Sequence, residues 1–106
     1  MQSAVYERPE HATAKPIGEW RVVRRSGLMP PVGLAKTIGS DTGETRLFGV
    51  PVGRFRVVGR MLIYRGWPVA DMLDQGEDGS WEGRGLLFGR EFCRFELHPD
   101  GREHGE

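Results

Sequence analysis

A run of unbalanced charge lies in the middle of the chain, where five arginines and no acid fall between residues 46 and 65. Arginine presents a planar fork of N–H donors that can hold a carboxylate or a phosphate through two hydrogen bonds. We therefore expect Arg54, Arg56 and Arg65 to contribute to a rim that recognises an anionic group. The alternative is a solvated face, whose arginines pair across strands with the four acids of residues 71–78.

Three large aromatic residues, Tyr64, Trp67 and Trp81, accompany these arginines in a chain with few aromatics. Trp67 stands between Gly66 and Pro68, a setting typical of a corner between strands. Aromatic side chains are also frequent at pockets and subunit contacts. We predict that the three aromatics join the three arginines as ligand-binding residues, with Trp67 at a pocket mouth or a dimer contact.

The triplet Asp41-Thr42-Gly43 is similar to the catalytic triplet of retroviral-type aspartic proteases. Those enzymes pair two carboxylates that share a proton in a dry site. Here Glu44 follows where a small residue would pack beneath the site. A hairpin turn explains the triplet with no further assumption. We predict no catalytic residue and favour a protein that is not an enzyme.

Other sequence signals for chemistry are weak. Gly83-x-Gly85 lacks the third glycine and the following helix of a dinucleotide-binding loop. The three histidines lie near the chain ends, so we predict no metal site and no catalytic triad. Cys93 alternates with apolar residues and is interpreted as a buried, inert thiol. No cofactor is implied.

The elements that would position these residues are strands. The chain has 16 glycines and 7 prolines, which is typical of short strands and tight turns. Alternating segments separated by turn residues predict an all-β fold, a small antiparallel meander barrel of about 7–8 strands. The expected strands are residues 19–25, 34–39, 44–48, 54–58, 60–65, 80–88 and 90–97, with 68–73 as either a strand or a helical turn.

Length and composition limit the class of protein. The 106 residues predict one domain, with an arm at residues 1–16, a barrel at 17–98 and a tail at 99–106. The net charge is zero, which gives no drive toward nucleic acid. No apolar run is long enough to span a membrane, and a single cysteine suits a reducing cytoplasm.

Gly18-Glu19-Trp20 on the first expected strand and Arg94 on the last resemble the lipocalin, or calycin, signature. In that family the tryptophan closes one end of the barrel and the arginine packs across it. The resemblance implies that Gly18, Trp20 and Arg94 form the barrel closure, with Arg94 over the indole. The expected interior comprises one face of the last strand and six residues of the others, Trp20, Val22, Phe55, Val57, Trp81 and Leu87.

Three functions follow from this architecture as hypotheses. The first is lipocalin-like binding of a small apolar or amphipathic molecule in a barrel cavity, with an arginine meeting an acidic head group. The second is a small barrel enzyme of the cyclase or isomerase type. The third is a homodimeric protein–protein interaction module, which a filled barrel with an apolar outer patch would favour.

Overall fold

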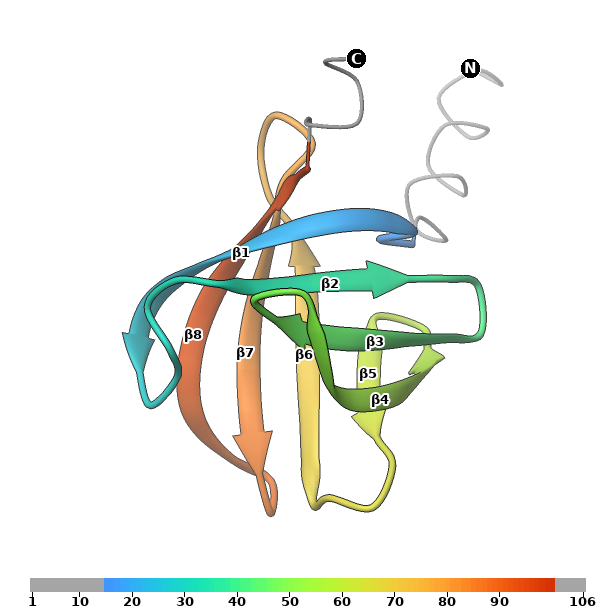
Figure 1. Cartoon of the computed structure of the whole chain (residues 1–106), viewed down its shortest axis with the longest axis vertical. Helices are drawn as coiled ribbons and strands as arrows, with labels where there is room; N and C mark the ends of the chain where they lie inside the picture. Colours follow the sequence, from blue (N-terminus) through green and yellow to red (C-terminus); the bar gives the residue numbers. More distant parts are fainter. Residues whose placement is uncertain (1–14, 101–106) are drawn as a thin grey trace, which may run out of the picture.

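A computed structural model describes residues 15–100, which form a closed antiparallel barrel with its strands in sequence order (Figure 1). All regular structure within these residues is strand, so the predicted all-β meander barrel is confirmed. The strands are β1 (Gly18–Gly27), β2 (Leu34–Ile38), β3 (Thr42–Leu47), β4 (Val50–Val58), β5 (Met61–Tyr64), β6 (Val69–Gln75), β7 (Trp81–Leu87) and β8 (Arg90–Pro99).

The barrel is closed by its two longest strands, β1 and β8, which pair along most of their length with Val22 opposite Leu97. The register shifts between Arg24 and Ser26, and again in the β7–β8 pair between Gly85 and Leu86. Such bulges raise the local twist and help a small sheet to curve into a barrel.

Several predicted boundaries change. Residues 68–73, left open between strand and helix, belong to the seven-residue strand β6. β4 begins at Val50 and includes Pro51, which lies next to a bulge in the β3–β4 pair, a place where proline is tolerated in a strand. The strands of the barrel run from Gly18 to Pro99, close to the expected domain. Most of the predicted arm and tail lies outside the described residues.

The interior is filled by aromatic rings that lie across glycines of neighbouring strands. A Cβ added at Gly83 would overlap the ring of Phe95, and one added at Gly43 would lie 2.6 Å from Phe55 Cε1. Real Cβ atoms do not approach carbon atoms this closely, so each glycine makes room for a ring. The buried apolar side chains are Trp20, Val22, Ile38, Phe55, Val57, Leu62, Leu73, Trp81, Cys93, Phe95 and Leu97.

Five of the six expected interior residues are buried, and Leu87 is the exception because its side chain is 41% exposed. Leu87 is the last residue of β7 and lies beyond the bulge at Gly85, beside the turn that leads into β8. The alternating pattern therefore ends before Leu87 reaches the core.

The closure of the barrel differs from the lipocalin-like expectation. Trp20 is buried, and its indole N–H donates to the Pro16 carbonyl at 2.8 Å. Trp20 lies opposite Pro99, whereas Arg94 lies opposite Ser26, five residues along β8, or about 17 Å away at ~3.3 Å per residue. Arg94 bonds Glu91 on the outer surface at 2.7 Å. Arg94 therefore does not cover the indole as expected.

Candidate functional site

A polar cluster lies inside the barrel and consists of Lys36, Thr45, Tyr64 and Asp71, each from a different strand. The Lys36 Nζ donates to Thr45 Oγ1 and to Tyr64 Oη at 2.7 Å each, and lies 3.1 Å from Asp71 Oδ2. The Tyr64 hydroxyl donates to the same carboxylate oxygen at 3.2 Å. An ammonium group has three N–H donors, so this cluster occupies all of them.

Burial and charge set the protonation of the cluster. The side chains of Lys36 and Asp71 are each 6% exposed. Burial lowers the pKa of Lys36, but the Asp71 carboxylate and the Tyr64 hydroxyl outweigh it, and the pKa is raised. Burial raises the pKa of Tyr64, which the Lys36 ammonium offsets only in part. Lys36 is therefore an ammonium ion at neutral pH, and it is not available as a nucleophile or a base.

The rings around Lys36 complete its surroundings. Its Nζ lies 5.4–5.7 Å from the ring centroids of Phe55, Tyr64 and Phe95. Cations are attracted to aromatic faces at this range. Within the described residues no buried side-chain nitrogen or oxygen lacks a hydrogen-bond partner. The cluster is thus a saturated core network.

Part of the outer surface of β5, β6 and β7, up to the level of Met72 and Arg84, is apolar. Met61 lies opposite Met72, and Ala70 lies between Ile63 and Leu86 in the register of the three strands. These five side chains alternate with inward residues such as Leu62 and Asp71, so they point away from the core. We call this surface the outer apolar face.

A hollow of about 260 Å³ opens on the outer apolar face. The side chain of Trp67 is 63% exposed beside it, and Phe88 of the β7–β8 turn is 80% exposed. The Phe88 N–H donates to the Pro68 carbonyl at 2.9 Å, which holds the two turns side by side. The hollow is lined by Met61, Ile63, Trp67, Pro68, Val69, Ala70, Leu86 and Gly89.

The predicted ligand-binding residues are not brought into one site. Tyr64 lies in the interior cluster, Trp81 is buried with the Arg60 guanidinium 5.8 Å from its ring, and Trp67 is outside. The arginines lie on the outer surface as well. Arg54 and Arg65 line a hollow of about 370 Å³ with Thr37 and Glu44, and Arg56 is exposed.

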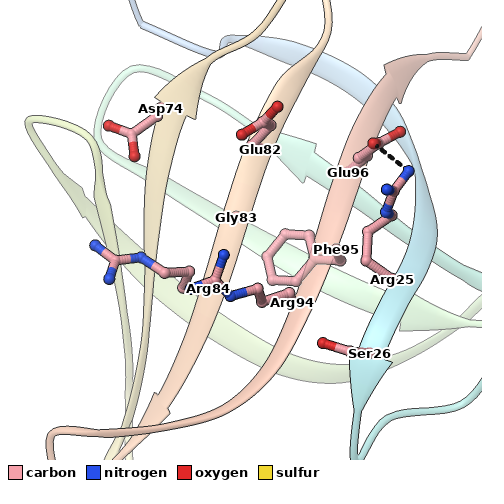
Figure 2. A pocket seen from close by; sticks show the side chains of 9 residues that line it. All are labelled: Arg25, Ser26, Asp74, Glu82, Gly83, Arg84, Arg94, Phe95 and Glu96. Carbon is pink, nitrogen blue, oxygen red and sulfur yellow. Dashed lines mark hydrogen bonds and ion pairs between the residues drawn. The ribbon is translucent and has the colours of Figure 1, made fainter.

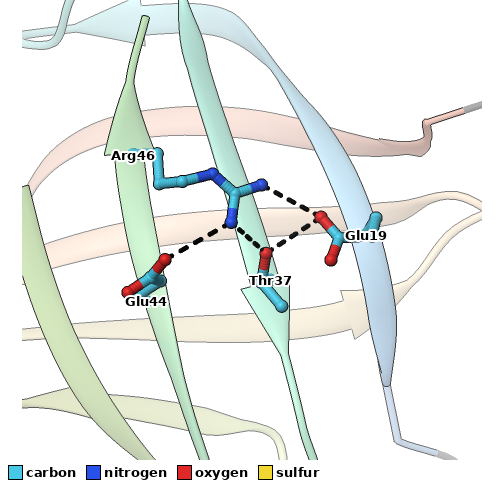
Figure 3. Close-up of polar contacts among 4 residues, drawn as sticks. All are labelled: Glu19, Thr37, Glu44 and Arg46. Carbon is cyan, nitrogen blue, oxygen red and sulfur yellow. Dashed lines mark hydrogen bonds and ion pairs between the residues drawn. The ribbon is translucent and has the colours of Figure 1, made fainter. Parts of the chain in front are cut away.

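One arginine of the basic run is bound by an acid of its own strand and by an acid of β1 (Figure 3). Arg46 Nη2 lies 3.0 Å from Glu19, Arg46 Nη1 lies 3.4 Å from Glu44, and the same nitrogen donates to Thr37. The hydrogen bond to Glu19 contributes most to the raised pKa of Arg46. This group links the outer surfaces of β1, β2 and β3. Its acids are not among the four of residues 71–78 with which the solvated-face alternative pairs the arginines.

Comparison of the chain with protein-family models, with curated proteins and with solved structures found no match. Among residues 15–100 no helix is long and apolar enough to cross a membrane. In the same residues no group of three or more histidine, cysteine and acidic side chains is placed to hold a metal ion. The geometry of the described residues alone therefore carries the functional argument.

Sequence reasoning missed both the interior cluster and the outer apolar face. Lys36 stands between Leu34 and Ile38 at alternate positions, which places a charge on an inward face. In β5 all four residues are apolar or aromatic, and such a run indicates a strand that is apolar on both faces. These two signals were present in the sequence.

Proposed function

We propose that this protein is a protein–protein interaction module that pairs with a second copy of itself through the outer apolar face. The hollow bordered by Trp67 on that face carries the proposal. Contiguous apolar surface on a soluble protein marks a site of interaction. Its removal from water by a partner is favourable by about 25 cal/mol per Å², from which the entropy lost on association is subtracted.

A second copy suits this face because the face holds both projections and a recess. Trp67 and Phe88 are strongly exposed, while the half-buried Ile63 and Ala70 line the hollow. A twofold dimer uses one patch twice and therefore needs a patch that is complementary to itself. The net charge of zero also removes long-range repulsion between copies.

The closed barrel limits how two copies can meet. β1 and β8 pair with each other, so none of the eight strands has a free edge. Pairing by strand addition needs such an edge. Two copies of this barrel can therefore associate through their outer faces and not by adding strands. The hollow is also small beside typical small-molecule pockets of roughly 300–1,000 Å³. Both observations favour a protein side chain as its occupant.

We also propose that the protein is related to the lipocalins and that it is located in the cytoplasm. An eight-stranded up-and-down barrel is the architecture of lipocalins, and the buried thiol of Cys93 is compatible with a reducing compartment. Binding of a small apolar molecule inside the barrel stays a prediction. It requires the rings that lie over Gly43 and Gly83 to move.

Sedimentation equilibrium over a concentration series tests the proposal. The wild type is expected at twice its 11.9 kDa chain mass, and Ile63→Glu is expected to be a monomer because it places a charge in the hollow. Val52→Glu is the matched control, since Val52 is exposed on β4 away from this face. A monomeric wild type at every concentration, or equal dissociation in both variants, would reject the proposal.

A further inference from the structure

A second surface lies on the outer face of β6, β7 and β8, where like charges stand directly opposite one another. Asp74 lies opposite Glu82, and Glu82 lies opposite Glu96, which forms a row of three carboxylates across the strands. Two residues further along, Arg84 lies opposite Arg94. Like charges directly opposite on neighbouring strands destabilise a sheet. These two rows therefore concentrate negative charge at one level of this surface and positive charge at the next.

The two rows border a hollow of about 550 Å³, the charged hollow (Figure 2). In the figure the carboxylates of Asp74, Glu82 and Glu96 lie toward one end of the strands, and the guanidinium groups of Arg84 and Arg94 lie toward the other. This volume falls within the range of roughly 300–1,000 Å³ that holds small ligands.

Part of the charged hollow is already fixed by internal pairs. Arg25 bonds Glu96 at 2.8 Å, and Arg94 bonds Glu91 at 2.7 Å. These pairs hold the border of the hollow in place and reduce the entropy lost on binding.

Three other charged groups of the hollow, Asp74, Glu82 and Arg84, form no ion pair within residues 15–100. Among the described side chains the only hydrogen bond of Arg84 is to the Met72 sulfur, at 3.8 Å. After Arg94, whose hydrogen bond contributes most, the charge of Arg84 also lowers the pKa of Glu91. Within residues 15–100 no hydrogen bond or ion pair is formed by the carboxylate of Asp74 or of Glu82. The hollow thus offers two carboxylates and one guanidinium to a ligand.

We propose that the charged hollow binds a small zwitterion, with its cationic group at Asp74 and Glu82 and its carboxylate at Arg84. The two rows are two residues apart along the strands, or about 7 Å at ~3.3 Å per residue. A linear amino acid whose amine and carboxylate stand at opposite ends of a short chain matches this separation. A molecule with a single charge meets only one row.

A two-dimensional amide NMR titration of the full chain tests this proposal with linear ω-amino acids. The probes are glycine, 4-aminobutanoate, 6-aminohexanoate and 8-aminooctanoate, with hexanoate and hexylamine as singly charged controls. We expect the tightest binding at the intermediate lengths, with shifts confined to the strands that line the hollow, which are β6, β7, β8 and the end of β1. Equal affinity for all lengths, equal affinity for a singly charged control, or no binding would overturn the proposal.

Variants separate this hollow from general charge effects. Glu82→Gln and Arg84→Gln are each expected to weaken 6-aminohexanoate binding about tenfold, as for loss of one charge-assisted contact. Glu77→Gln is the matched control, because Glu77 is an exposed acid in the β6–β7 turn outside the hollow. Unchanged binding in both test variants would also overturn the proposal. The Ile63→Glu variant should retain binding, so failure of the dimer and failure of the zwitterion site are distinguishable.

Discussion

Replacing Asp71 by asparagine should expose what the buried ion pair contributes, because it removes one charge and keeps the side-chain shape. The Lys36 ammonium then retains Thr45 and Tyr64 but loses the carboxylate that lies 3.1 Å away. At an effective dielectric constant of about 20, that attraction is worth about 5 kcal/mol. Removal of one partner of a buried pair costs about 3–5 kcal/mol in measured cases.

The stability lost in Asp71→Asn has an upper limit, because Lys36 can lose its proton when burial of its charge costs more than deprotonation. The ordinary pKa of lysine is 10.5, so neutralising it at pH 7 costs about 5 kcal/mol at ~1.36 kcal/mol per pH unit. Without Asp71, burial lowers the pKa of Lys36 in the folded state. The unfolded variant then binds more protons than the folded one, and its stability should rise with pH up to about pH 10. The wild type, whose Lys36 pKa is raised, should show no such rise.

Urea unfolding followed by tryptophan fluorescence, repeated between neutral pH and pH 10, measures both stabilities. Asp74→Asn is the matched control, because Asp74 is exposed on the same strand and should change stability by less than about 0.5 kcal/mol. If Asp71→Asn does not fold at pH 7, the double variant Lys36→Met/Asp71→Leu should recover most of the stability. Parallel pH curves for Asp71→Asn and the wild type would refute the reasoning.

Three further outcomes follow from the interior. Because the pKa values of Lys36 and Tyr64 are raised in the folded state, stability is complete below about pH 10 and should fall as pH rises further, which urea unfolding in alkaline buffers checks. Gly83→Ala should destabilise the protein by about 1–3 kcal/mol because the new methyl group overlaps the Phe95 ring. Thermal melts of Gly83→Ala in a Phe95→Leu background test this cause. A smaller loss of stability there supports it, and an equal loss contradicts it. Burial raises the pKa of Cys93, so its thiol should react with a disulfide reagent far more slowly in native protein than in urea, and equal rates would show that it is accessible.

The strand pattern could be predicted because inward and outward residues alternate clearly in most segments. Phe55 and Val57 alternate with arginines, and both are buried. Leu87 could not be placed, since a bulge in the β7–β8 pair changes the register just before it. A bulge depends on how two strands meet, and the sequence of one strand does not show it.

The site was less predictable than the fold, because the barrel buries charged side chains whose residue type is usually found on a protein surface. Lys36 and Asp71 are far apart in the chain, and each alone resembles a solvated charge. Only the pairing order of β2 through β6 places them on facing walls. Arg94 illustrates the opposite case, since it lies on the expected strand but at a different level from Trp20.

The pairing of β1 with β8 also affects how the chain must fold. All other pairs join strands that are neighbours in sequence, whereas this pair joins strands near the two ends of the described chain. Contacts between distant residues form slowly because a long loop must close first. Until that pairing forms, β1 and β8 each expose an unpaired strand edge, and such edges are prone to aggregation. The strands that complete the barrel are therefore expected to govern both its folding rate and its yield on refolding.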